Sequence, residues 1–139
     1  MQTVTDEFVP FKAHVKEQPG AFHRFNARWT PTQIVMDENG VERHRIEGFL
    51  ARDDFLAELE MGRAKIAFAN KEFAEAQKLF RQVLDRFPKT ASAAEACYWE
   101  GVSEYSRTHD AAALTRTGQR LKDRFPDSIW TRKGSVWLR

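Results

Sequence analysis

Residues 29–40 read Trp-Thr-Pro-Thr-Gln-Ile-Val-Met-Asp-Glu-Asn-Gly, and this stretch decides the fold of the first half of the chain. The apolar run at residues 32–37 predicts one β-strand, and residues 41–47 predict a second. Asn39-Gly40 lies between them and most readily supplies the positive φ angles of a tight hairpin turn. A helix is expected to open near Arg52, because the acidic residues after it suit the positive end of a helix dipole.

The residues before this stretch predict a strand and a short helix. Residues 8–15 alternate between apolar and polar side chains, and the period of two places four residues on one face: Val9, Phe11, Ala13 and Val15. Gln18-Pro19-Gly20 breaks the strand. Residues 21–27 then predict a helical turn. The expected order is strand, short helix, proline, hairpin and helix.

This order resembles the second half of a thioredoxin domain, over residues 8–59. Three motifs carry the resemblance in the family's order: Pro31-Thr32, Asp37-x-x-Gly40 and Arg45-x-x-Gly48-Phe49. The resemblance implies that Pro31 follows a cis peptide bond. It also implies a peptide-binding site at Trp29, Thr30 and Pro31, because thioredoxin-like proteins present backbone groups there to an extended peptide. Alternatively, Trp29 simply packs over the position of the family's active-site strand, which this chain lacks.

The half that carries thioredoxin's redox chemistry is missing. The family's Cys-x-x-Cys lies upstream of this stretch, whereas the single cysteine here, Cys97, lies far downstream in an apolar helical stripe. We therefore expect no catalytic residue and a core thiol at Cys97. The missing strand would lie between residues 8–15 and residues 32–37. Its absence leaves two open edges and uncovers the apolar side chains of Phe11, Ile34 and Val35.

Three outcomes are open for that gap. The sheet re-pairs, two chains share their edges, or the chain is a fragment or late-start version of a longer product. Met1 to Glu7 would align with the end of the helix that follows Cys-x-x-Cys, which favours a lost or omitted N-terminal segment. The open edges also predict a homo-oligomer, with a symmetric dimer as the simplest closed form.

The second half of the sequence contains a repeat. Asp85-Arg86-Phe87-Pro88 recurs as Asp123-Arg124-Phe125-Pro126, 38 residues later, and a period of this size predicts stacked helical pairs. The pattern resembles the tetratricopeptide repeat, which is usually about 34 residues long. Thr117 and Gly118 stand where the first unit has Leu79 and Phe80, so the second unit is expected to bury less.

The fold class that follows is α+β. Residues 1–60 are expected to form a truncated thioredoxin-like domain with an incomplete sheet, and residues 61–139 an all-α array of tetratricopeptide-like helical hairpins. Phe80 is expected in the helical core, so Phe80→Ala should cost about 3–5 kcal/mol. Arg120→Ala should cost almost nothing, because Arg120 is expected on a solvated face.

Positive charge is concentrated at the end of the chain. Residues 111–139 contain seven basic and two acidic residues, whereas the whole chain has a net charge of +2. Arg116, Arg120 and Arg124 recur every four residues and share one helix face. A solvated face is the default explanation, an acidic protein partner is the second, and nucleic acid is not favoured because no aromatic residue interleaves with these arginines.

Other chemistry has little support in the sequence. His14, His23, His44 and His109 are scattered without metal-ligand spacing, so neither a metal nor another cofactor is expected. No phosphate-binding loop, nucleophile elbow or paired-carboxylate motif occurs. No apolar run is long enough to span a bilayer, and Met1 to Asp6 lacks the features of a signal peptide. A cytoplasmic protein is expected.

These observations favour a non-catalytic module that binds a protein or peptide partner. The alternative is a portion of a thiol–disulfide oxidoreductase of the thioredoxin family whose Cys-x-x-Cys segment lies upstream of this chain. A third possibility is a purely structural oligomerisation unit.

Overall fold

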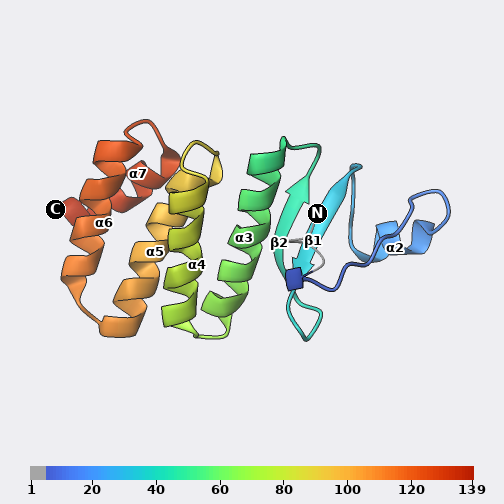
Figure 1. Cartoon of the computed structure of the whole chain (residues 1–139), viewed down its shortest axis with the longest axis horizontal. Helices are drawn as coiled ribbons and strands as arrows, with labels where there is room; N and C mark the ends of the chain where they lie inside the picture. The colour runs from blue at the N-terminus through green and yellow to red at the C-terminus, as the bar shows by residue number, and fades with distance from the viewer. Residues whose placement is uncertain (1–5) are drawn as a thin grey trace.

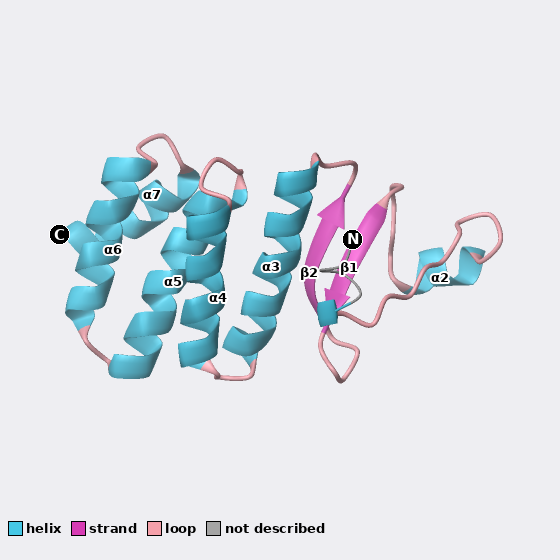
Figure 2. Cartoon of the chain, viewed as in Figure 1, coloured by secondary structure: helices cyan, strands magenta, loops and turns pink. Residues whose placement is uncertain are grey.

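The computed structural model describes residues 6–139 and is a mixed α+β structure (Figures 1 and 2). A β-hairpin lies near one end, and the helices that follow it stack side by side toward the C-terminus (Figure 1). The strands are β1 (Thr32–Met36) and β2 (Glu42–Glu47). The helices are α2 (Pro19–Arg24), α3 (Arg52–Ala69), α4 (Phe73–Arg86), α5 (Ser92–Thr108), α6 (Ala111–Arg124), α7 (Ile129–Gly134) and the 3₁₀ helix η1 (Ser135–Leu138).

The hairpin forms where the sequence predicts it. β1 and β2 pair in antiparallel fashion, with Val35 opposite His44. Asp37 stabilises the turn, because its Oδ1 atom accepts hydrogen bonds from the backbone N–H groups of Asn39 and Val41 at 2.9 and 3.0 Å. The bond from Val41, together with that from Arg43, outweighs burial and lowers the pKa of Asp37. Gly40 has a φ of +75°, which glycine adopts without steric cost.

The strand predicted at residues 8–15 is wrong. Residues 8–14 run without regular secondary structure, and the sheet of the described residues contains β1 and β2 alone. Val9 is 99% exposed and Phe11 is 76% exposed, so the alternating apolar side chains meet solvent. A strand needs a neighbour to satisfy its backbone groups. The described residues supply none beside this segment, and the alternating pattern alone does not create one.

Helix α3 packs on both halves of the molecule. Its residues Leu59 and Ile66 pack with Val35 and Ile46 of the hairpin. Its other side joins the helical core through small and apolar residues: Ala57, Met61, Ala64 and Ala67. Val35 is therefore buried under α3, which corrects the expectation that it lies uncovered. The expected boundary between residues 60 and 61 falls inside this continuous helix.

Close packing between α3 and the hairpin depends on Gly62. A Cβ atom placed on Gly62 would lie 2.8 Å from Cγ2 of Val35. Such a separation is shorter than any stable contact between carbon atoms. The absence of a side chain at Gly62 lets β1 approach the helix, and the contact fixes where the hairpin sits.

The helical core is centred on α4 and α5. Phe80, Val83 and Leu84 of α4 are buried against residues of α3 and α5, and Cys97 is buried with them. The second unit is packed differently from the first. Thr117 of α6 fits against Gly101 of α5, where a Cβ atom would lie 1.9 Å from the Thr117 hydroxyl.

The end of the chain covers α6. A Cβ atom placed on Gly118 of α6 would lie 3.1 Å from the carbonyl oxygen of Gly134 and 3.2 Å from the side chain of Leu138. Trp137 stacks on Tyr98 of α5, with ring centroids 4.8 Å apart. The small residues at positions 117 and 118 thus admit close neighbours, and both are buried.

We predict that Phe80→Ala lowers the free energy of unfolding by about 3–5 kcal/mol, because Phe80 is fully buried and truncation leaves a cavity. Phe49→Ala is the matched control, since Phe49 is 87% exposed and should change stability by less than about 0.5 kcal/mol. Denaturant unfolding monitored by circular dichroism measures both variants. Equal losses would contradict the assigned core.

Candidate functional site

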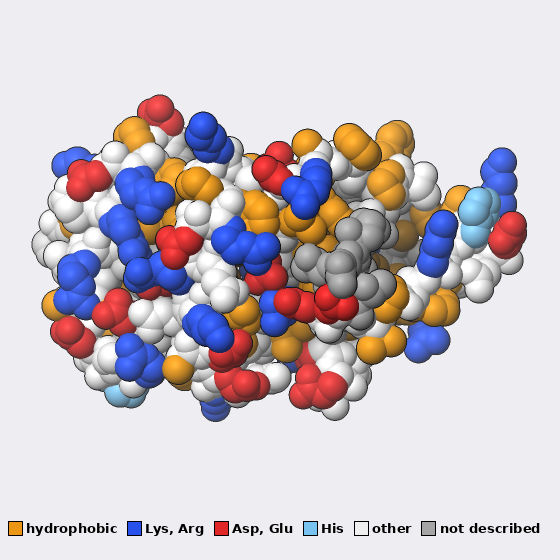
Figure 3. All heavy atoms as spheres, in the orientation of Figure 1, with side chains coloured by type: hydrophobic (Ala, Val, Ile, Leu, Met, Phe, Trp, Pro, Cys, Tyr) orange, Lys and Arg blue, Asp and Glu red, His pale blue; other side chains and the backbone are white. Residues whose placement is uncertain are grey.

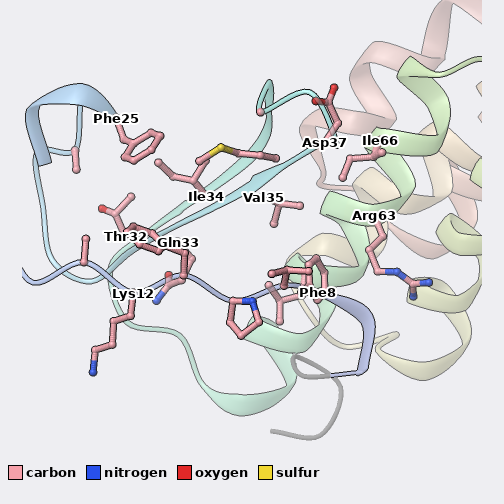
Figure 4. A pocket seen from close by; sticks show the side chains of 18 of the residues that line it. Phe8, Lys12, Phe25, Thr32, Gln33, Ile34, Val35, Asp37, Arg63 and Ile66 are labelled. Atoms are coloured by element: carbon pink, nitrogen blue, oxygen red, sulfur yellow. The ribbon is translucent and has the colours of Figure 1, made fainter. Parts of the chain in front are cut away.

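An open cleft of about 1300 Å³ lies beside strand β1 (Figure 4). One wall is the N-terminal segment, residues 8–15, and the other is β1. Helix α3 contributes the apolar side chains of Phe55, Leu59 and Ile66. In Figure 4 the N-terminal segment passes below β1, with the side chains of Gln33 and Phe8 between them. We call this feature the β1 cleft.

The edge of β1 that faces the cleft carries backbone groups without a strand partner. Pro31 accepts a hydrogen bond from Gly48 at 2.8 Å, and Asp37 donates one to Val41 at 3.0 Å. Backbone groups alternate between the two sides of a strand, so odd-numbered residues pair with β2 and Thr32, Ile34 and Met36 point the other way. Among the described residues, no backbone hydrogen bond connects these three to another segment.

Gln33 adds an unsatisfied side-chain acceptor. Its Oε1 atom is buried and has no hydrogen-bond partner among the described residues. Gln33 lines the β1 cleft, and Figure 4 shows its side chain directed toward the N-terminal segment. A buried acceptor without a partner is costly. A donor that entered the cleft would remove this cost.

The expected peptide-binding residues lie at one end of this cleft. The Thr30–Pro31 peptide bond is cis, and both residues line the cleft wall. Trp29 is outside the lining, with 65% of its surface exposed. The Trp29 carbonyl accepts a hydrogen bond of 2.7 Å from the Thr32 hydroxyl, which holds the turn before β1. The three residues are therefore adjacent to the open edge, and Trp29 does not pack over it.

The three arginines of the expected basic face differ in their surroundings. Arg116 forms an ion pair with Glu104 at 2.8 Å. Arg120 pairs with Glu100, and its Nε atom is buried. Arg124 lies over the ring of Phe125, at 5.3 Å from its centroid. Figure 3 shows Lys and Arg side chains gathered over the helical half of the visible face.

Glu100 is a buried charge that the sequence analysis missed. Its side chain is fully buried in α5 and accepts hydrogen bonds from Arg81 at 2.7 Å, from Gln77 at 3.2 Å and from Arg120. Burial works to raise the pKa of Glu100, but the hydrogen bonds from Arg81 and Arg120 outweigh it and lower the pKa. The sequence contains one sign that Glu100 is buried. Its helical spacing from Ala93, Ala96 and Cys97 places this charge on an apolar stripe.

Arg120 therefore has a structural role, contrary to the expected solvated position. Together with Arg81 it neutralises Glu100 between helices α4, α5 and α6. A shallow hollow of about 370 Å³ lies next to Glu100 and is lined by Lys78, Arg81 and Arg107. The basic surface is thus centred on α4 and the end of α5 as well as on α6.

A second polar cluster joins the hairpin to the helices. Glu58 of α3 accepts a hydrogen bond of 2.9 Å from the hydroxyl of Ser92 in α5, and it contacts Nε2 of His44 in β2. Lys65 lies 3.1 Å from Nδ1 of His44 and acts as the donor there, so Nε2 carries the proton toward Glu58. Burial works to raise the pKa of Glu58, but His44 and Ser92 outweigh it and lower the pKa.

The thiol, the possible metal ligands and the helices of residues 6–139 complete the description. Cys97 is buried, and burial raises the pKa of its thiol, which disfavours the nucleophilic thiolate. Within residues 6–139, no group of three histidine, cysteine or carboxylate side chains is placed to hold a metal ion. In the same part of the chain, no helix is long and apolar enough to cross a membrane.

We predict that Arg120→Ala lowers the free energy of unfolding by about 1–3 kcal/mol, because it leaves one oxygen of the buried Glu100 without its cationic partner. Arg116→Ala is the matched control. In its ion pair with Glu104 the Arg116 side chain is 59% exposed, so solvent screens the pair and it should contribute less than about 1 kcal/mol. Urea unfolding of both variants tests the difference, and a harmless Arg120→Ala would show that Glu100 does not depend on Arg120.

We also predict that acid destabilises the fold through Glu58 and Glu100. Their folded pKa values lie below the ordinary value of about 4.5, so their contribution to stability is complete above that pH. It is lost as the pH falls through the folded pKa values. Unfolding free energies should therefore change little between about pH 7 and 5.5 and decline below about pH 4.5.

Glu58→Gln tests how much Glu58 contributes to the loss of unfolding free energy in acid. The variant should show a smaller decline in unfolding free energy between neutral and acidic pH than the unmodified chain. Glu38→Gln is the control, because Glu38 is exposed in the hairpin turn and has no ion pair among the described residues. An unchanged pH profile for Glu58→Gln would show that Glu58 does not contribute.

Comparison with known proteins places a similarity in the first half of the chain. Residues 2–63 match the family model of a thioredoxin-like domain. The match covers the N-terminal segment, the hairpin and two thirds of α3. Comparisons with curated proteins and with solved structures found no match. The matched residues, which end at Arg63, include most of the residues that line the β1 cleft. This part of the chain is therefore similar to a thioredoxin-like domain.

Proposed function

We propose that the chain is a non-catalytic interaction module that binds an extended protein segment along the free edge of β1. The observation that carries the proposal is the open backbone edge of Thr32, Ile34 and Met36 beside an apolar cleft. An incoming strand would satisfy these backbone groups by strand addition. Its side chains would cover the apolar surface supplied by α3.

The geometry also suggests how such a segment would be recognised. Backbone pairing tolerates many sequences, so specificity would come from the cleft walls. Residues i and i+2 of the bound strand would face α3, where Phe55, Leu59 and Ile66 favour apolar side chains. Trp29, Thr30 and Pro31 would contact one end of the bound segment.

We further propose that the helical half is a tetratricopeptide-like array that supports this site and offers a second contact. Phe87-Pro88 follows α4 and Phe125-Pro126 follows α6, so the repeated motif ends equivalent helices. The basic residues Lys78, Arg81 and Arg107 surround the hollow beside Glu100, and this surface suits an acidic stretch of a protein partner. In this proposal residues 1–60 hold the strand site and residues 61–139 form the array.

The second candidate is a portion of a thiol–disulfide oxidoreductase with its Cys-x-x-Cys segment upstream. The match of residues 2–63 to a thioredoxin-like domain favours it. Residues 6–139 supply one buried thiol, whereas dithiol exchange needs two. An in-frame Trp-Cys-x-x-Cys in the genomic sequence upstream of the Met1 codon would support the oxidoreductase, and its absence there would remove it.

We predict that peptides selected from a random ten-residue display library on this chain have alternating apolar residues. Their binding should slow hydrogen exchange at the amides of Ile34 and Met36, because these groups would become paired. Amide exchange and backbone NMR shifts of the chain with each synthetic peptide provide the measurement. Selected peptides that perturb only helices α4 to α6 would contradict the proposed site.

Two substitutions at one position provide the control. Ile34→Pro removes the N–H group on the free edge and leaves the ladder to β2, so it should abolish peptide binding. Ile34→Thr keeps the N–H group and should retain binding within about tenfold. The circular dichroism spectrum checks that both variants fold. Binding that survives Ile34→Pro would rule out backbone pairing.

A further inference from the structure

The N-terminal segment has the properties of a strand that lacks a partner. Phe8 anchors it by packing on the cluster of Val35, Ile46 and Leu59. Beyond Phe8, Val9 is almost fully exposed and Phe11 is about three-quarters exposed. The segment thus presents an alternating apolar stripe next to a cleft with an open strand edge. The chain therefore contains both a free strand edge, that of β1, and an unpaired segment with a strand pattern.

The charges of the segment and the cleft are complementary. Residues 8–16 contain Lys12 and Lys16 and no acidic residue. The lining of the β1 cleft includes three carboxylates, Glu38, Glu72 and Glu75, which we call its acidic rim, and none of these has an ion pair among the described residues. A segment with the charge of residues 8–16 would therefore be attracted to this rim.

We propose that the N-terminal segment of a second copy of this chain occupies the β1 cleft, and that the exchange is mutual. This inference rests on the proposed strand site and names its occupant. Each cleft lies between β1 and the chain's own N-terminal segment. A segment inserted from the partner would therefore pair with β1 on one side and with the chain's own N-terminal segment on the other. The order across the dimer is β2, β1, partner segment, own segment, partner β1 and partner β2.

A two-fold axis between the two central segments generates this arrangement. The axis makes the two segments antiparallel and the interface self-complementary. Both free β1 edges are filled at once, and the mutual exchange closes the assembly at two copies. A five-residue strand about 17 Å long, about 5 Å wide and about 10 Å thick occupies about 800 Å³. The cleft of about 1300 Å³ holds such a strand with its larger side chains.

The sequence of the segment limits which residues pair. Pro10 has no N–H group, so a continuous ladder is expected from Phe11 onward. The backbone carbonyl of His14 already accepts a hydrogen bond from Gln18 at 2.7 Å, which begins the turn toward α2. The two-fold axis should therefore pass between the two N-terminal segments near Lys12 or Ala13. Val9 and Phe11 would bury their side chains at the interface.

Light scattering after size-exclusion chromatography tests the dimer with the full chain. We expect twice the 16.1 kDa mass at high micromolar concentration. Phe11→Lys should weaken the dimer by at least about 30-fold, as expected for a buried aromatic anchor. Phe49→Lys is the matched control, because Phe49 is another mostly exposed phenylalanine but lies outside the cleft lining, and it should leave the dimer intact. A monomer at high micromolar concentration would overturn the proposal.

A cysteine scan locates the axis. Single cysteines are placed in turn at residues 11–14 of a Cys97→Ala variant. Equivalent residues near a two-fold axis face each other, so an intermolecular disulfide should form most efficiently at Lys12 or Ala13 and less efficiently on either side. Glu38→Cys in the same background is the control and should not cross-link. Uniform cross-linking across these positions would overturn the arrangement.

A peptide of residues 7–16 separates this inference from the proposed function. It should compete with dimer formation and slow hydrogen exchange at Ile34 and Met36. If the chain is monomeric and this peptide does not bind, while library peptides still bind the β1 edge, the mutual exchange is wrong and the strand site stands. If no peptide binds and a dimer forms through the helices, both proposals are wrong.

Discussion

The contact between Gly62 and Val35 is the constraint on which the rest of the structure depends. Because Gly62 has no side chain, β1 lies directly against α3, and the hairpin needs no other layer on that face. The opposite side of α3 enters the helical core through alanines and Met61. One helix thereby gives the hairpin a hydrophobic support that a two-stranded sheet cannot provide for itself. It also holds the β1 cleft in a fixed relation to the helices.

A half-buried carboxylate, Glu58, and a fully buried one, Glu100, tie the remaining elements together. Glu58 connects the hairpin to α5 through His44 and Ser92, and Glu100 connects α4, α5 and α6 through two arginines. A buried charge is costly unless it is paired, so each network specifies a single arrangement of the helices around it. Part of the positive charge on this face, that of Arg81 and Arg120, therefore serves the fold by pairing with Glu100. The cations at its margin, Lys78 and Arg107, are freer to meet acidic groups.

The β1 cleft shows the opposite situation, in which groups suited to pairing stand open. Thr32, Ile34 and Met36 direct backbone groups toward a space that the described residues leave unfilled, and Gln33 adds an acceptor without a partner. Natural sheets usually protect such edges with charge, twist or a covering element. Here the edge is bordered by an exposed apolar segment and by acidic residues at the rim. These features are the ones on which the proposed binding of another strand rests.

Local sequence determined the elements whose signals are short-range. Asn39-Gly40 and the flanking apolar runs specified the hairpin, and the repeated Asp-Arg-Phe-Pro marked the ends of α4 and α6. Tertiary structure decided what depends on neighbours distant in the chain. Residues 8–15 have a strand pattern but no strand beside them, so they remain irregular. Arg120 was expected on a solvated face, whereas helix packing pairs it with the buried Glu100. The Gly62–Val35 contact arises only when the hairpin folds back onto α3. Periodicity reports which face of an element is apolar, whereas the partner of that face is fixed by the packing of the whole chain.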